Sequence, residues 1–285
     1  MTLSPQNTSP GYGDSAEPGG ADGTLIEHTT DNGVSWITLN RPQTINAITP
    51  DQREWLISKF FLASSDPAVR ALVITGSGKG FCSGADLRAA AGPTAAERIP
   101  GDVARTLRQG AQRLIGAVLD CEKPVIAAVN GIAAGLGAHL ALACDLVLAS
   151  ERATFLEVFV RRALVPDAGG AYLLTRLVGP QRAKELMFFG DPLTAPEAHH
   201  LGLVNRVVPE AELTATAERW AGRLAAGPTR ALALTKQLVN SAGESDRAAA
   251  FAAEASAQEI NMNTADAAEG IAAFLEHRAP RYRGR

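Results

Sequence analysis

The chain has 285 residues, of which 46% are hydrophobic and 5% aromatic, and its formal net charge is −3 at pH 7. This length and apolar content are enough to bury a substantial core, in one large domain or two small ones. The charge balance and the lack of a basic stripe with interleaved aromatic residues argue against nucleic acid as a partner. The sequence has no basic leader followed by an apolar stretch and no run of about 18 apolar residues, so we expect neither secretion nor membrane insertion.

Residues 1–23 are rich in Ser, Pro, Gly, Asp and Thr and are predicted to form a disordered tail outside the fold. From residue 24 the apolar pattern alternates between strand and helix periods. Strands are predicted at residues 33–40, 69–75, 124–130 and 145–149, helices at residues 50–63, 104–119 and 136–143, and residues 154–160 continue the alternation. Alternation of this kind predicts an α/β core, which we place at residues 24–209.

After Val208 no strand pattern remains. Residues 210–226, 229–241 and 246–275 are predicted to be helical, so the chain is expected to end in a helical region at residues 210–285. The last of these segments is rich in alanine and carries a long apolar stripe, which is typical of an interface between subunits.

Three cysteines, Cys82, Cys121 and Cys144, lie in apolar or glycine-rich runs without metal-ligand spacing or a disulfide-dense pattern. We therefore expect reduced thiols in a cytoplasmic protein, and no metal site.

Two glycine-rich segments indicate where an anion binds. Between Lys123 and Asp145, an apolar run stops at Asn130-Gly131 and a helical pattern starts near Leu136. The first N–H groups of such a helix have no intrahelical partner and carry the positive end of its dipole, which suits a developing oxyanion. The alternative is a tight turn whose glycines serve packing only. In the second segment, a strand pattern from Ala71 meets four glycines within nine residues.

These segments occur together with Leu39-Asn-Arg-Pro upstream and Val165-Pro-Asp-Ala-Gly-Gly downstream. In order and spacing they resemble the enoyl-CoA hydratase/isomerase (crotonase) superfamily over about residues 24–285. The resemblance implies a spiral of ββα units followed by a C-terminal helical trimerisation region, and a homotrimer or a dimer of trimers. It also implies an acyl-CoA substrate, with coenzyme A arriving as part of the thioester and no permanently bound cofactor.

The resemblance assigns two groups of site residues. The backbone N–H groups of Ala85 and Leu136 would bind the thioester carbonyl, where a preorganised donor contributes about 3 to 4 kcal/mol to the transition state. Arg88 would contact the coenzyme A phosphates, and Phe274 and His277 would reach the nucleotide of a neighbouring subunit; the alternative for these residues is ordinary surface exposure. The full set of expected coenzyme A contacts is Ala47, Ser83, Ala85, Asp86, Leu87, Arg88, Phe274 and His277.

Hydratases of this superfamily carry two glutamates, and this chain has His139 and Phe159 at the matching positions. Phenylalanine cannot transfer a proton, so syn hydration of a double bond is disfavoured. His139 lies in an apolar helical stretch, where it is either a hydrogen-bonded wall of the pocket or a base.

A carboxylate appears instead at Asp167, in a Pro-Asp-x-Gly-Gly pattern that resembles the single-aspartate isomerases of the superfamily. Moving a double bond needs one group that removes a proton and returns it two carbons away. The alternative is that Asp167 caps a helix over residues 168–177. Glu157 is the reserve candidate for the base, since alternation with Phe155 and Phe159 places it on the same strand face. The alternative to a catalytic role for Glu157 is a solvated or paired charge at the surface.

The sequence therefore favours an enoyl-CoA isomerase that uses a single-carboxylate proton shuttle and an oxyanion hole. The second interpretation is an enoyl-CoA hydratase of fatty-acid or aromatic-acid degradation. The third is a non-catalytic acyl-CoA-binding protein, because neither of the two glutamates is present.

Overall fold

The computed structural model describes residues 24–29, 32–89 and 99–285, so the predicted tail at residues 1–23 lies outside the described residues. Its larger sheet has six strands in the spatial order β1-β2-β3-β5-β7-β10. The first pair is antiparallel and every other neighbouring pair is parallel. The strands are β1 (Thr24–Thr29), β2 (Val34–Asn40), β3 (Ala71–Gly76), β5 (Val125–Val129), β7 (Leu146–Ser150) and β10 (Arg206–Val208).

A smaller sheet of four short strands has the order β4-β6-β8-β9. β4 (Gly80–Cys82), β6 (Ile132–Ala134) and β8 (Thr154–Leu156) are parallel, and β9 (Leu193–Thr194) runs antiparallel to β8. Because parallel strands end at the same edge of a sheet, the segments that follow β4, β6 and β8 leave the small sheet on one side.

Pairs of strands alternate with helices along the chain, as the resemblance implied. β1 and β2 precede α1, β3 and β4 precede α2 and α3, β5 and β6 precede α4, and β7 and β8 precede α5. The ββα arrangement is therefore confirmed. These helices are α1 (Pro50–Ser65), α2 (Asp102–Gln109), α3 (Ala111–Leu119), α4 (Leu136–Ala143) and α5 (Gly170–Phe189), followed by α6 (Ala195–His200).

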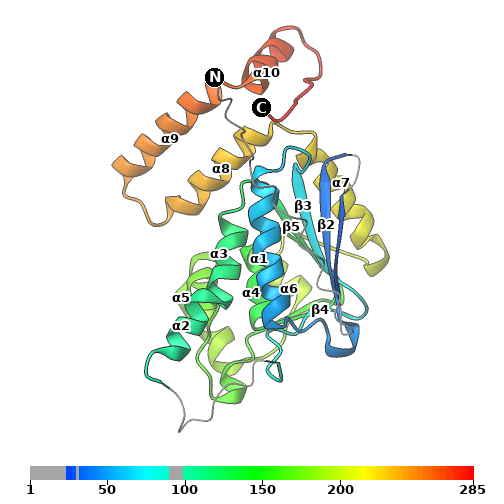
Figure 1. Ribbon diagram of the computed structural model, residues 1–285, viewed down its shortest axis with the longest axis vertical. Coiled ribbons are helices and arrows are strands. Elements are labelled where there is room, and N and C mark those ends of the chain that lie inside the picture. Colours follow the sequence, from blue (N-terminus) through cyan, green and yellow to red (C-terminus); the bar gives the residue numbers. More distant parts are fainter. Residues whose placement is uncertain (1–23, 30–31, 90–98) are drawn as a thin grey trace, which may run out of the picture.

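The two faces of the large sheet are covered by different helices. Successive side chains of a strand point to opposite faces, so Leu72 and Ile74 of β3 join the core with α1, α3 and α4. Ala71 and Val73 instead pack with α7 (Leu213–Ala225). Figure 1 shows α1 and α3 on one side of this sheet and α7 on the other.

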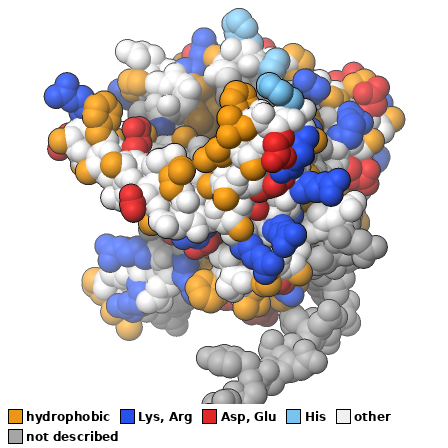
Figure 2. All heavy atoms as spheres, turned by 90° about the horizontal axis from the view of Figure 1, so that it is seen from above, with side chains coloured by type: hydrophobic (Ala, Val, Ile, Leu, Met, Phe, Trp, Pro, Cys, Tyr) orange, Lys and Arg blue, Asp and Glu red, His pale blue; other side chains and the backbone are white. Residues whose placement is uncertain are grey.

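The last three helices, α8 (Thr229–Ala242), α9 (Arg247–Met262) and α10 (Ala265–Leu275), extend beyond the sheets at one end of the molecule (Figure 1). Lys236 of α8 anchors them through a largely buried ion pair, 2.9 Å from Nζ to Oδ2 of Asp145. Figure 2 looks onto this end and shows hydrophobic side chains at the surface. Exposed hydrophobic residues of α9 and α10 include Phe251, Ile260, Ile271, Phe274 and Leu275. No helix within the described ranges is both long and apolar enough to cross a membrane.

Three predicted helices differ from those observed. Residues 104–119 form two helices, because Gly110 leaves the helical conformation at φ −108° and ψ −100°. Residues 246–275 also form two, since the side chain of Thr264 caps α10 by accepting a hydrogen bond from the N–H of Ala267 at 3.1 Å. The helix expected at residues 168–177 begins at Gly170 and runs to Phe189 with a kink at Gly179.

Candidate active site

The candidate site lies where the three parallel strands of the small sheet end. Ala85 follows β4, Leu136 follows β6 and Glu157 follows β8. The last residues of β6 and β8, Ala134 and Leu156, are paired in register, and the N–H of Gly135 donates to the carbonyl of Leu156 at 2.9 Å. The topology of this sheet therefore gathers three predicted site segments at one edge.

The two backbone amides expected to bind an oxyanion belong to segments in close backbone contact. Gly84 has φ +106°, and a Cβ built on it would lie 2.9 Å from the carbonyl oxygen of Ala134 and 3.6 Å from the nitrogen of Leu136. Leu136 is the first residue of α4, where the N–H has no intrahelical acceptor. Neither Ala85 nor Leu136 donates a backbone hydrogen bond to any described residue. The arrangement therefore leaves two donors free for a ligand.

The thiol of Cys82 fixes the start of this loop. The N–H of Gly84 donates to its Sγ at 3.4 Å, and Cys82 also packs directly against Gly137 of α4. Burial raises the pKa of Cys82 to about 12, so the side chain stays a neutral thiol. Sequence reasoning classed Cys82 only as a reduced thiol and missed this structural role.

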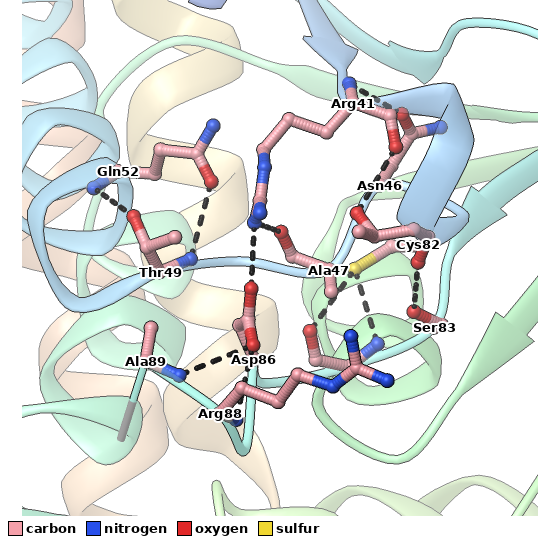
Figure 3. Close-up of polar contacts among 12 residues, drawn as sticks. Arg41, Asn46, Ala47, Thr49, Gln52, Cys82, Ser83, Asp86, Arg88 and Ala89 are labelled. Atoms are coloured by element: carbon pink, nitrogen blue, oxygen red, sulfur yellow. Dashed lines mark hydrogen bonds and ion pairs between the residues drawn. The ribbon is translucent and has the colours of Figure 1, made fainter. Parts of the chain in front are cut away.

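An ion pair ties the loop after β4 to the segment between β2 and α1 (Figure 3). Nη1 of Arg41 lies 2.9 Å from Oδ2 of Asp86 and 2.8 Å from the carbonyl oxygen of Ala47. The other oxygen of Asp86 accepts the N–H groups of Arg88 and Ala89. The hydrogen bond from Arg41 lowers the pKa of Asp86, which stays ionised. The Asp86 carboxylate therefore holds the loop, while Arg88 beside it is exposed.

His139 and Glu157 form a buried pair. Nε2 of His139 lies 3.0 Å from Oε1 and 3.1 Å from Oε2 of Glu157. The His139 side chain is completely buried and that of Glu157 is 6% exposed. The ring of Phe159 stacks on His139 with a centroid separation of 5.6 Å and an angle of 7° between planes. The solvated surface charge considered for Glu157 is therefore wrong, and His139 is hydrogen-bonded to Glu157.

Asp167 lies in a turn just before α5. The N-cap of this helix is Gly169 and no side chain caps it, so a capping role for Asp167 is wrong. The backbone carbonyl of Asp167 accepts the N–H of Gly170 at 3.0 Å, with Ala168 and Gly169 at positive φ between them.

The carboxyl group of Asp167 is half-buried and has no hydrogen-bond partner among the described residues. Burial raises the pKa of Asp167 above its ordinary value, and the nearby charges of His139 and Glu157 act on it in opposite directions.

One family model, described as enoyl-CoA hydratase/isomerase, matches residues 29–285. The chain belongs to the enoyl-CoA hydratase/isomerase family. Among its relatives, the Escherichia coli protein named 1,2-epoxyphenylacetyl-CoA isomerase is 37% identical, covering 92% of this chain and 98% of its own length. A crotonyl-CoA hydratase of Syntrophomonas wolfei is 38% identical, covering 84% of this chain and 90% of its own.

A crystal structure of an enoyl-CoA hydratase/isomerase from Cupriavidus metallidurans has a TM-score of 0.85 and 38% identity, covering 92% of this chain and 96% of that one. The resemblance found in the sequence and the crotonase-like fold class are therefore confirmed. Because the relatives include a hydratase and an isomerase, membership of the family establishes an acyl-CoA enzyme without choosing between these reactions.

In this enoyl-CoA hydratase/isomerase family member, the expected coenzyme A contacts fall into two places. Ala47, Ser83, Asp86, Leu87 and Arg88 belong to the two segments that the Arg41–Asp86 pair joins. Phe274 and His277 are exposed at the end of α10, which Figure 1 draws at the opposite end of the molecule from β4 and α5. Within one chain they are not brought to the candidate site.

Sequence reasoning missed the partner of His139 and the role of Arg41. A signal for the first was present, since a histidine and a glutamate in apolar surroundings are seldom buried unless each has a partner. Which residue pairs with His139 depends on the pairing of β6 with β8, and the periodicity of the sequence does not contain that information.

Proposed function

We propose that this chain is an enoyl-CoA isomerase in which Asp167 carries a proton between two carbons of the substrate. The observation that supports this assignment is the contrast between two carboxyl groups. Glu157 is buried and bound to His139, whereas Asp167 is half-buried, without a hydrogen-bond partner in the described part of the chain. Burial also raises the pKa of Asp167, which makes its carboxylate a stronger base.

In the proposed reaction, the Asp167 carboxylate removes a proton from C2 of a 3-enoyl-CoA thioester. The electron pair of that C–H bond moves onto the thioester oxygen, where the N–H groups of Ala85 and Leu136 stabilise the resulting dienolate. Asp167 then returns the proton to C4, and the double bond moves from C3–C4 to C2–C3. Losing one such donor typically costs 100-fold to 1,000-fold in rate.

The experiment measures conversion of 3-enoyl-CoA to 2-enoyl-CoA, and deuterium incorporation from solvent, in four proteins. These are the wild type, Asp167→Asn, His139→Ala and Glu157→Gln. We expect Asp167→Asn to keep acyl-CoA affinity and to lose at least 100-fold in rate, in line with the usual contribution of general acid–base catalysis. Full activity in Asp167→Asn, with either of the other variants inactive, would assign the base to the His139–Glu157 pair.

Hydration is the second candidate, because a similar relative is named crotonyl-CoA hydratase. Adding water requires a group that activates the water and a group that delivers the α-proton, and Phe159 supplies neither. A panel of 2-enoyl-, 3-enoyl- and cyclic enoyl-CoA thioesters, followed by mass spectrometry and absorbance, separates the two reactions. Addition of 18 mass units identifies hydration, whereas isomerisation leaves the mass unchanged. Tight binding with no turnover of any thioester would support the third interpretation, a non-catalytic acyl-CoA-binding protein.

We further propose that residues 210–285 form a trimerisation region and that the active assembly is a trimer or a dimer of trimers in the cytoplasm. The exposed side chains of Phe274 and Leu275 on α10 support this assembly, because exposed apolar patches mark interfaces. A neighbouring subunit would bring Phe274 and His277 to the nucleotide, with Arg88 at the phosphates. The mass from light scattering at micromolar concentration tests the assembly, and a monomer mass contradicts it.

A further inference from the structure

The imidazole of His139 lies directly against the turn that carries Asp167. A Cβ on Gly170 would overlap the Cε1 and Nε2 atoms of the ring, so any side chain at this position would displace the imidazole. The N–H of Gly170 donates to the backbone carbonyl of Asp167, and the intervening residues Ala168 and Gly169 have φ of +48° and +74°. Left-handed conformations are costly for alanine and persist where the surroundings hold them. The ring therefore supports the turn.

The ring is itself held on two sides. Both carboxylate oxygens of Glu157 lie within 3.1 Å of Nε2 of His139, and Phe159 stacks on the face of the ring. His139 comes from α4 and Glu157 from the segment after β8, so the pair joins two of the strand ends that form the site.

We propose that His139 and Glu157 are positioning residues for Asp167: the imidazole supports the turn from Asp167 to Gly170, and Glu157 places a fixed negative charge beside the Asp167 carboxyl group. This inference rests on the proposed proton shuttle at Asp167, and it assigns the pair a function other than proton transfer to the substrate.

The hydrogen bonds of the pair indicate its charge. Nδ1 of His139 is buried and has no partner among the described residues. A doubly protonated ring would place an N–H donor there without an acceptor, whereas a neutral ring that donates from Nε2 to Glu157 leaves only a lone pair at Nδ1. A buried donor left without a partner is costly. The Nε2–H of His139 is therefore the donor to Glu157, whose carboxylate is the acidic group of the pair.

The charge of Glu157 acts on Asp167 together with its burial. Burial raises the pKa of Asp167, His139 lowers it and Glu157 raises it, so removing the charge of Glu157 removes one of the two raising effects. The other titratable groups around the turn have partners elsewhere: Arg161 pairs with Asp191, Arg162 donates to the carbonyl of Val158, and Tyr172 donates to Glu244. From α3 the apolar side chain of Ile115 faces Gly169. A carboxylate with a raised proton affinity is better suited to removing a proton from carbon.

The decisive variant is Glu157→Gln, because the amide oxygen still accepts the Nε2–H of His139 while the charge is removed. Titration of the Asp167 carboxyl carbon by 13C NMR measures the effect without any substrate. We expect the midpoint to move to lower pH than in the wild type, and the acidic limb of the kcat profile to move the same way. We also expect kcat to fall by about tenfold with KM within about twofold, since a weaker base removes the proton more slowly.

Asp145→Asn is the matched control. It also replaces a largely buried carboxylate, one that is hydrogen-bonded to Lys236 at 2.9 Å, but it lies outside the turn. It should leave the Asp167 midpoint and the pH of the acidic limb of the kcat profile unchanged. A second variant, Gly170→Ala, displaces the ring while both members of the pair remain, and should lower kcat more than it raises KM.

The outcomes separate this inference from the proposed function. If the titration midpoint of Asp167 is the same in folded Glu157→Gln as in the wild type, the inference is overturned and the proposed function is not. The same holds if Glu157→Gln loses as much activity as Asp167→Asn. Wild-type activity in Asp167→Asn would overturn the proposed proton shuttle at Asp167, independently of the Asp167 midpoint measured in Glu157→Gln.

Discussion

Arg41 and Asp86 lie 45 residues apart in the sequence and form an ion pair, with 2.9 Å between Nη1 and Oδ2. The pair closes the loop that presents the Ala85 amide against the segment before α1 (Figure 3). Because Arg41 also donates to the carbonyl of Ala47, one guanidinium connects two segments expected to bind coenzyme A. The loop that forms half of the proposed oxyanion hole is therefore held in place by a residue outside it.

Removing the charge of Asp86 should have an effect that depends on pH. The pKa of Asp86 is lowered from 3.8 by the hydrogen bond from Arg41, so the ionised carboxylate stabilises the folded state above that pH and the contribution is lost as pH falls through the lowered pKa. Asp86→Asn should therefore lose about 1.5 to 3 kcal/mol of unfolding free energy near pH 7, the usual range for a hydrogen bond to a charged group. Urea unfolding at several pH values should show the difference from wild type shrinking below pH 3.8. A difference that is constant with pH would contradict the ionised pair.

Gly84→Ala should abolish most turnover. The φ of +106° is strained for any side chain, and the new Cβ would lie 2.9 Å from the carbonyl oxygen of Ala134, which displaces the N–H groups of Ala85 and Leu136. The expected loss in kcat is 100-fold or more. Gly101→Ala is the matched control, because Gly101 has φ +93° but an added Cβ would meet no atom of the described residues within 4 Å. Equal losses in the two variants would attribute the effect to backbone strain instead of the oxyanion hole.

Asp167→Asn should be at least as stable as wild type at pH 7. Burial raises the pKa of Asp167, so the folded state binds the proton more tightly than the unfolded state and stability falls as pH rises through the raised pKa. Asparagine removes this cost of an ionised, partly desolvated carboxylate. Thermal unfolding between pH 7 and pH 4 should show an advantage for the variant that shrinks towards the acidic end. Lower stability of the variant at pH 7 would show that the carboxylate is held by a stabilising partner.

The three cysteines should be unreactive in the native protein. Cys82, Cys121 and Cys144 are free and buried, and desolvation by burial raises the pKa of the Cys82 and Cys144 thiols. Since the thiolate is the reactive form, a disulfide reagent at pH 8 should label native protein slowly and all three cysteines after denaturation. Rapid labelling of native protein would show that the loop around Cys82 opens.

The sequence determined most of the local structure. The alternation of apolar residues located β2, β3, β5, β7 and α4 within one or two residues, because burial of one face imposes a period on the chain itself. The glycine-rich bends indicated the two segments that carry the amides, and the family resemblance named Ala85 and Leu136 within them; Gly84 adopts a φ that only glycine tolerates without strain. Helix breaks were less predictable: Gly110 interrupts residues 104–119 through its backbone conformation, while the apolar pattern continues through it.

The tertiary structure decided how the polar groups are used. Pairing of β6 with β8 brings His139 to Glu157, which lies 18 residues further along the chain, and the resulting ring packs on the turn of Asp167. The same turn places Gly169 at the helix cap and leaves the Asp167 carboxyl group without a partner in the described chain. A buried charge must find a partner wherever the topology provides one, so its partner depends on which strands are neighbours. Periodicity records only which residues are buried, and for this reason the sequence named the candidate groups but not the pairs that they form.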